Sequence, residues 1–405
     1  MNYNTYPIAD LIDEIAMGPF GSNIKVDCFV DKGIPVLNGS NLEGFELSEK
    51  SFRYVTEEKA DSLKKANAYK GDVVITHRGT LGQIVYIPQT AQRDRYVISQ
   101  SQFRVKCNKK VLPEYFVYYF HTPIGQHKLL SNASQVGVPA LARPSSTFQK
   151  IEIEIPDLET QKKVVKLIGS LQTRIKTNAE INDNLMQQAV TIFKSWFVEY
   201  SPFDGIEPKE WETVNLEKIT SLISRGLAPK YSDNSDQIVI NQKCIRNHMI
   251  DLSQARTHTP KVINEKWLRF GDLLINSTGD GTLGRAAQVW FQPQNITVDS
   301  HVTVVRPAKE NLIFYIGLWG VLHESEIESL HTGSTGQTEL PKERVKALEL
   351  HLPDNGTLDR FNTLIAPMAA AIVSKQNENN KLATLRDALL PKLMSGEIDV
   401  SAVQL

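Results

Sequence analysis

The stretch Gly71-Asp72-Val73-Val74-Ile75 decides how this chain is organised, because it occurs twice. It returns 200 residues later as Gly271-Asp272-Leu273-Leu274-Ile275. Three further segments are repeated in the same order: Gly79-Thr80-Leu81-Gly82 as Gly281-Thr282-Leu283-Gly284, Ile98-Ser99-Gln100-Ser101 as Val298-Asp299-Ser300-His301, and Ile155-Pro156-Asp157 as Leu352-Pro353-Asp354. The chain is therefore predicted to contain two similar but non-identical copies of one folded unit, the simplest arrangement for reading two linked sites.

Length and composition favour a soluble, cytoplasmic protein. The 405 residues allow two domains of roughly 150 residues plus connecting elements, each with its own core. The sequence contains no run of 18 apolar residues that could span a membrane. Its first residues lack the pattern of a secretory leader. The three cysteines, Cys28, Cys107 and Cys244, are far apart and form no CxxC metal motif, so we expect them to be reduced.

The net charge of −1 argues against a uniformly basic nucleic-acid-binding protein. The charge is unevenly distributed, however. Residues 51–150 contain fifteen lysines and arginines but only six acidic residues, an excess of nine positive charges. A basic face is therefore expected on the first copy rather than on the second.

Within each copy, short apolar runs alternate with turns, which predicts an α+β fold. Both Gly-Asp turns lead into a buried strand, and a second strand follows at residues 84–88 or 287–291. Helices are predicted over 111–121 and 312–323. A polar loop comes next, and each copy ends on an alternating strand at 151–155 or 348–352.

A long amphipathic helix is predicted after each copy, with Asp157 as the N-cap of the first helix. Both helices carry an apolar seam with steps of four and three residues over more than four heptads, which is typical of a coiled coil of about 60 Å. Polar residues interrupt each seam near its middle, and equivalent positions differ by 197. The two seams run through Val164, Ile168, Leu171, Ile175, Asn178, Asn182, Leu185, Ala189, Ile192 and Trp196, and through Phe361, Ile365, Met368, Ile372, Lys375, Asn379, Leu382, Arg386, Leu389 and Leu393.

The polar interruption fixes the register of the pair but leaves its direction open. At full overlap a central polar layer meets the other polar layer in either a parallel or an antiparallel pair. Pro367 and Pro391 each remove a backbone donor, so a kink or a late start is predicted for the second helix.

No catalytic constellation is present in the sequence, and we expect neither catalytic residues nor a metal site. Gly279-Asp280-Gly281-Thr282-Leu283-Gly284 fits a dinucleotide-binding GxGxxG pattern, but a strand rather than a helix is predicted to follow it. A turn that both copies need is the favoured interpretation. His323-Glu324 lacks the second histidine of HExxH, and there is no Walker loop, GxSxG elbow or amino-methyltransferase tetrad.

Three pairs of polar loops are the best candidate sites: 18–25 with 224–230, 76–80 with 276–280, and 134–137 with 333–337. Their side chains are of the types that read base edges and bind phosphates, although loops are also polar simply because they face water. The candidate DNA-contacting residues are Ser22, Asn23, Lys25, Arg78, Thr80, Gln135, Arg143, Arg225, Lys230, Ser277, Thr278, Thr282, Arg285, Ser334, Thr335 and Gln337.

Two segments resemble a known family. Phe193-Lys194-Ser195-Trp196-Phe197-Val198-Glu199-Tyr200-Ser201-Pro202-Phe203 resembles the central conserved region of type I restriction–modification specificity subunits. Leu389-Leu390-Pro391-Lys392-Leu393-Met394-Ser395-Gly396-Glu397-Ile398 resembles the end of their distal conserved region. Together with the duplication, the resemblance covers essentially the whole chain.

The resemblance implies two target recognition domains in a pseudo-twofold arrangement, joined by an antiparallel coiled coil. The boundaries are 1–156 for the first domain, 157–199 for the central helix, 200–353 for the linker and second domain, and 354–405 for the distal helix and tail. Each domain would read one half of a split double-stranded DNA target. Two modification subunits would use S-adenosylmethionine, and restriction subunits would use ATP and Mg²⁺, with no cofactor in this chain itself.

Apolar residues near the ends of the long helices are candidate contacts with partner subunits: Phe193, Trp196, Phe197 and Leu393. Trp196 lies on the seam and is an equally good core residue, whereas Phe193 and Phe197 lie one step off the seam. Two other functions remain open. One is a two-headed adaptor that binds proteins or glycans through the same loops, and the other is an enzyme in an unrecognised fold.

Overall fold

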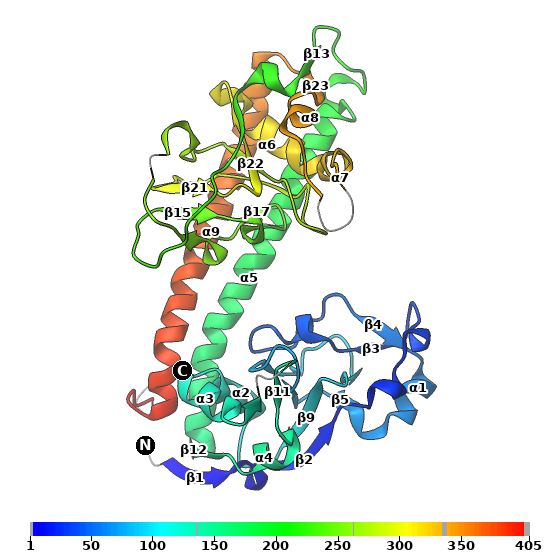
Figure 1. The fold of residues 1–405 in the computed structure, drawn as a ribbon, viewed down its shortest axis with the longest axis vertical. Helices are drawn as coiled ribbons and strands as arrows, with labels where there is room; N and C mark the ends of the chain where they lie inside the picture. Colours follow the sequence, from blue (N-terminus) through cyan, green and yellow to red (C-terminus); the bar gives the residue numbers. More distant parts are fainter. Residues whose placement is uncertain (1–2, 135–136, 262, 334–337, 401–405) are drawn as a thin grey trace. The chain divides into compact units, whose positions relative to one another are not determined.

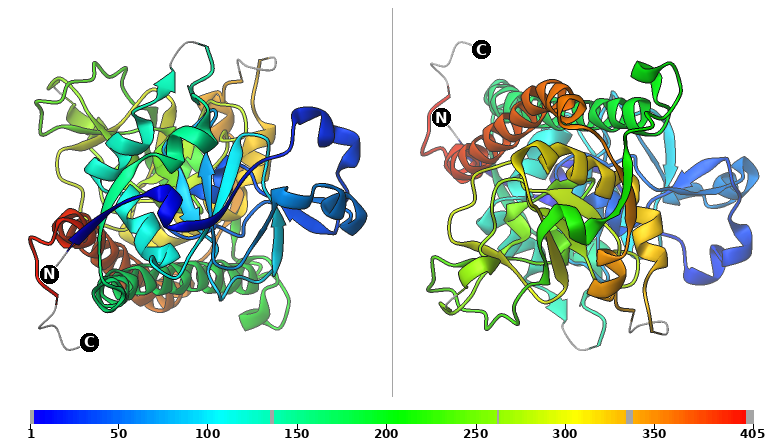
Figure 2. Two further views of the ribbon diagram at one scale, coloured as in Figure 1. Left: turned by 90° about the horizontal axis from the view of Figure 1, so that it is seen from below. Right: turned by 90° about the horizontal axis from the view of Figure 1, so that it is seen from above.

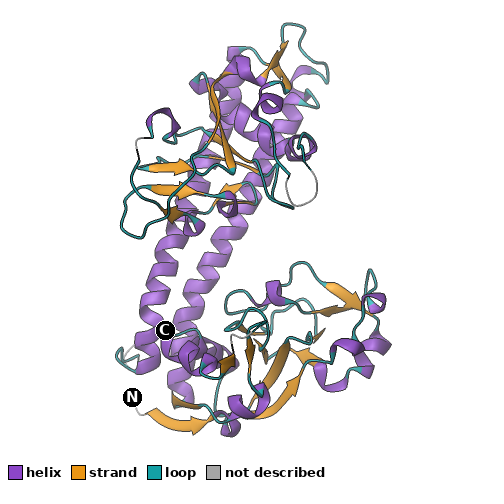
Figure 3. Cartoon of the chain, viewed as in Figure 1, coloured by secondary structure: helices purple, strands orange, loops and turns teal. Residues whose placement is uncertain are grey.

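A computed structural model describes residues 3–134, 137–261, 263–333 and 338–400. The chain divides into two compact units, which are considered separately: unit 1 consists of Met1–Arg174 and Lys381–Leu405, and unit 2 of Ile175–Asn380. Each unit mixes helices and strands, so the predicted α+β class is confirmed (Figure 3). No helix in the described ranges is both long and apolar enough to cross a membrane.

Unit 1 is built on two four-stranded sheets and two antiparallel pairs of strands (Figure 1). The first sheet has the order β2-β9-β6-β7 and is antiparallel throughout; the second has the order β4-β3-β8-β5, with β3 and β8 parallel. The pairs are β1-β12 and β10-β11. The strands are β1 Tyr3–Pro7, β2 Ile12–Met17, β3 Ile34–Val36, β4 Arg53–Val55, β5 Asn67–Tyr69, β6 Asp72–Thr76, β7 Ile84–Tyr86, β8 Arg95–Val97, β9 Gln102–Cys107, β10 Ala133–Ser134, β11 Ala140–Leu141 and β12 Glu152–Pro156.

Unit 2 repeats the main topology of unit 1. Its four-stranded sheet has the order β14-β22-β19-β20, and its second sheet, β18-β15-β21, again contains one parallel pair. The pair β13-β23 corresponds to β1-β12, and β16-β17 is an additional hairpin. The strands are β13 Glu212–Asn215, β14 Thr220–Arg225, β15 Ile238–Ile240, β16 Ile245–Arg246, β17 Met249–Ile250, β18 Arg256–Thr257, β19 Leu273–Asn276, β20 Ala286–Gln288, β21 Ile296–Val298, β22 Val302–Pro307 and β23 Glu349–Leu352. The duplication seen in the sequence is therefore a duplication of fold.

Helices cover the sheets of both units at the predicted places, with additional short helices that the pattern did not indicate. The α-helices are α1 Glu57–Ser62, α2 Pro113–Phe120, α3 Pro123–Leu130, α4 Pro144–Gln149, α5 Leu158–Phe197, α6 Ile313–Leu322, α7 Glu324–Ser329, α8 Lys342–Lys346 and α9 Asn355–Ser395. The expected helices over 111–121 and 312–323 correspond to α2 and α6.

The repeated apolar stretch forms a strand that is buried on both faces. In unit 1, Val73 and Ile75 belong to the core cluster shared with the helices, while Val74 belongs to the cluster between the two sheets. In unit 2, Leu273 and Leu274 divide in the same way. Successive side chains of a strand point to opposite faces. A strand with cores on both sides must therefore be apolar at every position, which explains the continuous run.

The aspartate at the start of each buried strand pairs with a buried arginine of the neighbouring strand. In unit 2, Asp272 accepts two hydrogen bonds of 2.7 Å from Arg306, through Nε and Nη2. In unit 1, Asp72 accepts one bond of 3.3 Å from Arg104, which also contacts Glu14 at 3.1 Å. Burial raises the pKa of Asp72, and the hydrogen bond from the Tyr69 backbone and the nearby Arg104 charge oppose that rise. The Gly-Asp turns of the sequence thus include a buried ion pair in each unit.

Both long helices begin at an equivalent cap. The Thr160 N–H donates to the Asp157 carboxylate at 2.9 Å, and the Thr357 N–H donates to Asp354 at 3.0 Å. The pKa of Asp157 lies below its usual value because the Thr160 backbone donates to it. The expected N-cap at Asp157 is confirmed, and the second copy uses the same device.

Within unit 2, the second half of α5 lies along the first half of α9 (Figure 1). Hydrogen bonds show that their polar layers meet. Asn178 Nδ2 donates to Asn379 Oδ1 at 2.9 Å, and Asn379 Nδ2 donates to the Ile175 carbonyl at 3.0 Å. Asn182 Nδ2 donates to the Ile372 carbonyl at 3.3 Å. Residues that ascend along α5 meet residues that descend along α9, so the pair is antiparallel, as the family resemblance implied.

This polar layer should couple Asn178 and Asn379 energetically. Replacing Asn178 alone by leucine removes the donor to Asn379 and should lower the free energy of unfolding by about 1–3 kcal/mol. Replacing both by leucine should recover most of that loss, because neither partner then leaves an unmatched amide. A double-mutant cycle by urea denaturation measures the coupling. Gln187→Leu on the exposed face of α5 is the matched control, and a double variant no more stable than Asn178→Leu would contradict the expectation.

The prediction of a late start for the second helix is wrong. The helix α9 begins at Asn355 and continues through Pro367 and Pro391 to Ser395. Pro367 and Thr363, whose carbonyl loses its helical partner, are both exposed, so water can hydrogen-bond to that carbonyl. Packing of the opposite face, with Ile365 fully buried, holds the helix together.

The end of α9 is anchored in unit 1 next to β1 (Figure 2). The Tyr3 hydroxyl donates to the Leu393 carbonyl at 3.0 Å, and Leu393 is fully buried in the core of the unit. Within this unit Arg386 Nη1 donates to Gln172 Oε1 of α5 at 2.9 Å, again between antiparallel helix segments. Residues near the amino terminus and residues at the end of α9 are far apart in the sequence, but they share one hydrophobic core.

Candidate nucleic-acid interface

Three loops of unit 1 meet at the carboxyl end of β6. The Gly18 N–H donates to the Gln102 carbonyl at 2.8 Å, which holds the loop after β2 against the start of β9. The His77 N–H donates to the Ser101 carbonyl at 2.9 Å, and the Leu141 N–H donates to the His77 carbonyl at 2.9 Å. The loops 18–25, 76–80 and the β10–β11 region are therefore joined by backbone hydrogen bonds; we call this group loop cluster 1.

Unit 2 contains the same arrangement, which we call loop cluster 2. The Gly226 N–H donates to the Val302 carbonyl at 3.0 Å, the Ser277 N–H to His301 at 2.8 Å, and the Leu340 N–H to Ser277 at 2.9 Å. Each of these bonds has its counterpart in loop cluster 1. The pairing of loop 18–25 with 224–230 and of loop 76–80 with 276–280, inferred from sequence, is thus seen in the structure. Most of the third predicted pair, 134–137 with 333–337, lies outside the described residues.

A glycine with no room for a side chain begins the first loop of each cluster. A Cβ atom on Gly18 would lie 1.9 Å from the Ser99 carbonyl oxygen, and one on Gly226 would lie 2.0 Å from the Val298 carbonyl oxygen. Both neighbours are backbone atoms, which cannot move without disturbing a strand end. Glycine is therefore required for close packing here.

Gly226→Ala and Gly18→Ala should each destabilise the unit that contains them, because overpacking a tight site costs about 1–3 kcal/mol or more. Gly39→Ala is the control, since its Cβ would meet only the Gln83 side chain at an ordinary 3.6 Å. Urea unfolding of the three variants measures the difference. A loss in Gly226→Ala no larger than in Gly39→Ala would refute the requirement.

The GxGxxG segment forms a turn between two strands, so the turn interpretation is confirmed. Gly279, Gly281 and Gly284 have positive φ angles of 96°, 71° and 86°, and β20 follows them instead of a helix. Gly79 and Gly82 take positive φ in the first copy as well. Positive φ is costly for residues with a Cβ, which explains why these glycines recur.

Loop cluster 1 exposes basic and polar side chains. Asn23, Lys25, Arg78, Thr80 and Arg143 are all exposed. Beneath them, the His77 Nε2 atom lies 3.1 Å from the Gln100 carbonyl, and burial lowers the pKa of this histidine below its usual value. The neutral His77 imidazole can donate a hydrogen bond to that carbonyl and so stabilises the loop. The side chains of Lys25, Arg78 and Arg143 face solvent.

Loop cluster 2 uses several of its predicted residues for internal contacts. Arg225 pairs with Glu339 and donates to the Leu340 carbonyl at 2.7 Å. Thr282 Oγ1 donates to the Gly279 carbonyl at 3.2 Å, and Arg285 Nη2 donates to Gly281 at 2.8 Å. These three side chains stabilise the loops, whereas Lys230 is exposed.

The expectation that Ser277 contacts DNA is wrong, because its side chain is fully buried. Its Oγ lies 2.6 Å from Thr303 Oγ1 of the adjacent strand β22. The next residue, Thr278, lies at the surface of a polar cavity of about 510 Å³, and its Oγ1 is 2.7 Å from His301 Nδ1. The alternation of a strand end places Ser277 inward and Thr278 outward.

The polar cavity of loop cluster 2 brings together residues of three loops and one helical turn. Its lining is Gln242, Thr278, Gly279, Asp280, His301, Thr338 and Glu339. Of these residues only Thr278 was among the predicted DNA contacts. The repeated segment at 298–301 was a usable signal for His301, but nothing local in the sequence indicated Gln242. The predicted residues Gln135, Ser334, Thr335 and Gln337, and the side chain of Ser22, lie outside the described part of the chain.

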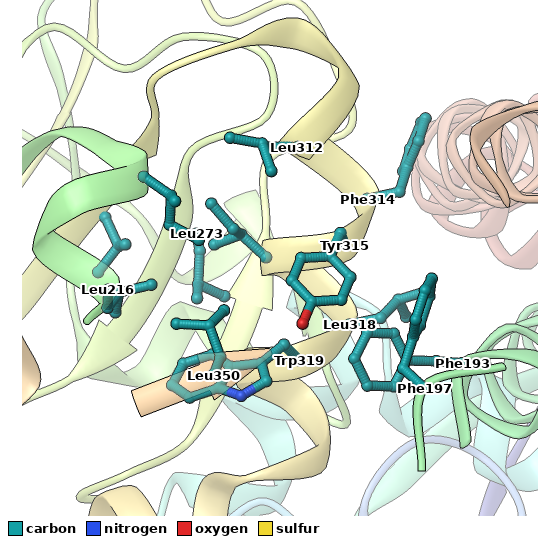
Figure 4. Packing of buried hydrophobic residues seen from close by; sticks show 14 of the residues in the cluster. Phe193, Phe197, Leu216, Leu273, Leu312, Phe314, Tyr315, Leu318, Trp319 and Leu350 are labelled. Atoms are coloured by element: carbon teal, nitrogen blue, oxygen red, sulfur yellow. The ribbon is translucent and has the colours of Figure 1, made fainter. Parts of the chain in front are cut away.

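The predictions that Phe193, Phe197 and Leu393 contact partner subunits are wrong, because all three are buried in hydrophobic cores. The ring centroids of Phe193 and Phe197 lie 5.5 and 4.9 Å from that of Tyr315 on α6 (Figure 4). In unit 2 the helix α5 packs against both α9 and the globular domain, so its apolar surface is wider than one seam. Trp196 is half-buried beneath Arg360, and its role toward a partner stays a prediction.

Comparison with known proteins agrees with this duplicated architecture. The family model for the type I restriction modification DNA specificity domain matches residues 20–187 and again residues 208–366. The type I restriction enzyme MjaIX specificity subunit of Methanocaldococcus jannaschii is 25% identical over 418 residues, covering 96% of this chain and 92% of that protein. The HindI specificity subunit of Haemophilus influenzae is 21% identical, covering 81% and 87%.

A solved structure shares the fold. The crystal structure of the type I restriction–modification system S subunit from M. genitalium superposes with a TM-score of 0.56 at 13% identity, covering 97% of this chain and 96% of that one. The chain belongs to the type I restriction modification DNA specificity domain family, with two copies of the domain. It is a specificity subunit of a type I restriction–modification system, a DNA-recognition component. The adaptor alternative is not favoured.

Proposed function

We propose that loop clusters 1 and 2 each read one half of a split double-stranded DNA target. The observation that carries this proposal is the set of three equivalent backbone hydrogen bonds that assemble both clusters from non-identical loops. A shared framework holds the loops in comparable geometry, while the differing side chains select different base sequences. Arginine, lysine, asparagine and threonine side chains on such loops can contact base edges and phosphates.

The two clusters differ electrostatically, so we propose different balances of contacts. Loop cluster 1 presents Lys25, Arg78 and Arg143 to solvent, which suits phosphate binding. Loop cluster 2 contains Asp280 and Glu339 around its polar cavity, and Glu339 neutralises Arg225. Carboxylates can accept from cytosine N4 in the major groove. Unit 1 would thus hold DNA more strongly, and unit 2 would depend more on base contacts.

The chemistry of the system would lie in partner proteins. Two modification subunits would assemble with this chain and methylate adenine with S-adenosylmethionine, and restriction subunits would use ATP and Mg²⁺ for translocation and cleavage. This chain would then act as the non-catalytic scaffold that selects the sequence, and it would work in the cytoplasm, where its DNA substrate is found.

Exchange of one recognition domain tests the proposal directly. Residues 206–352 are replaced by the corresponding domain of a relative, and the complex with modification subunits is expressed in cells. Sequencing of the methylated DNA motif should then show one half of the target changed and the other half retained. A chimera carrying a relative's domain in place of residues 1–156 should show the reciprocal result. Changes in both halves from either exchange would refute independent reading.

A further inference from the structure

The segment that begins loop cluster 1 exposes a large aromatic side chain beside the basic residues. Phe20 is 83% exposed, a fraction that only Val26 equals among the large hydrophobic side chains in the described ranges. Folding usually buries an aromatic ring because its apolar surface is large. An exposed ring on a basic surface therefore indicates a partner that combines negative charge with flat apolar faces.

The backbone on both sides of Phe20 is fixed. Gly18 is bonded to Gln102, and a Cβ on Gly21 would lie 2.3 Å from Gln100 Oε1, so Gly21 packs closely on that side chain. The Asn23 N–H donates to the Phe20 carbonyl at 2.8 Å. Pro19 restricts its own φ angle. Phe20 is thus presented from a rigid position, which reduces the entropy lost when its ring is bound.

The same neighbours join Phe20 to the basic residues of the cluster. The segment 99–102, on which Gly18 and Gly21 pack, also accepts hydrogen bonds at Gln100 from the His77 ring and at Ser101 from the Arg78 N–H. The exposed Arg78 and Phe20 are therefore held by two adjacent loops on one short segment. In DNA a negatively charged phosphate likewise lies close to a flat base, so a basic side chain and an aromatic ring held near each other suit such a partner.

We propose that Phe20 stacks against a base step of the half-site read by unit 1, as an apolar wedge that partly unstacks the duplex. DNA-bending proteins insert phenylalanine between base pairs in this way and partly unstack them. The free-energy cost of unstacking is offset by the additional contacts that the bent DNA makes with the protein. The proposal rests on the proposed DNA-reading function and adds a residue and a mode of contact to it. In unit 2 the corresponding loop places Ala228 two residues after Gly226, so the wedge belongs to one half-site.

The test uses the full chain in complex with its modification subunits. Duplexes containing the methylated target motif carry 2-aminopurine at single positions of the unit 1 half-site, other than the adenine that becomes methylated. The wild-type complex should raise 2-aminopurine fluorescence at one step, and Phe20→Ala should abolish that rise and weaken binding roughly ten- to a hundredfold. Phe20→Trp should retain binding and show tryptophan quenching by DNA.

Tyr69→Ala is the matched control, because Tyr69 is an aromatic residue 48% exposed that precedes β6, at the end of the strand opposite to residues 77–80. It should leave both signals unchanged. Wild-type affinity in Phe20→Ala would overturn the wedge while leaving the proposed function intact. A Phe20→Ala chain that no longer assembles with modification subunits would overturn it in favour of a protein contact. A wild-type complex indifferent to the target motif would overturn both proposals.

Discussion

Asp272→Asn should lower the free energy of unfolding by about 3–5 kcal/mol, because it removes the charge that compensates a buried arginine. Asp272 is completely buried and Arg306 nearly so, and two hydrogen bonds of 2.7 Å join them. Arg306 also donates to the Glu265 and Trp267 carbonyls, so its guanidinium cannot turn to solvent without breaking further bonds. Urea denaturation of the purified chain measures the loss.

Two comparisons make this prediction specific. Asp72→Asn in unit 1 should cost less, because Arg104 makes one longer bond to Asp72 and keeps Glu14 as a second carboxylate partner. Asp94→Asn should have no measurable effect, since Asp94 is 91% exposed in its pair with Lys70. Equal losses in the Asp272 and Asp94 variants would show that burial does not set the strength of these pairs.

Insertion of one base pair between the two half-sites should reduce binding by the assembled complex by at least about 10²-fold. One base pair shifts the second half-site by about a tenth of a helical turn. On the proposed function each recognition domain reads one half-site, and the continuous helices α5 and α9 that join the domains would resist such a shift. Each mismatched base pair alone costs about 1–3 kcal/mol of binding free energy. The loss of all contacts with one half-site should therefore cost more than a single mismatch.

Competition binding at constant salt measures this effect, since the phosphate term depends strongly on salt. A base-pair substitution at the centre of the gap, which leaves the spacing unchanged, is the control and should bind like the native target. Equal affinity for the native and the lengthened gap would contradict reading at fixed spacing.

Local patterns in the sequence predicted the elements of the fold because their causes are local. Alternation, glycine turns and the Asp157 cap act over a few residues, and the structure has strands, turns and a cap at those places. The duplication added long-range information, since two matching copies must share a topology. The second sheet of each unit was not predicted, because its strands are mostly of three residues and carry almost no periodicity.

The candidate site was harder to predict, because exposure depends on contacts between distant residues. Arg78 and Arg225 occur in similar polar loops, yet Arg225 pairs with the Glu339 carboxylate while Arg78 is exposed. Ser277 and Thr278 are adjacent and chemically alike, and the strand end buries one of them. Phe193 and Phe197 lie off the coiled-coil seam, but Tyr315 of α6 packs against them.

Three properties can be read from the amino-acid sequence: there are two copies, each is followed by a long capped helix, and polar positions interrupt both helix seams near the middle. These properties follow from repetition and from periodicity. The direction of the helix pair was decided only by the tertiary structure, where Asn178 meets Asn379 in an antiparallel arrangement. A central polar layer matches itself in either orientation, so the choice depends on how segments of both helices pack within each unit.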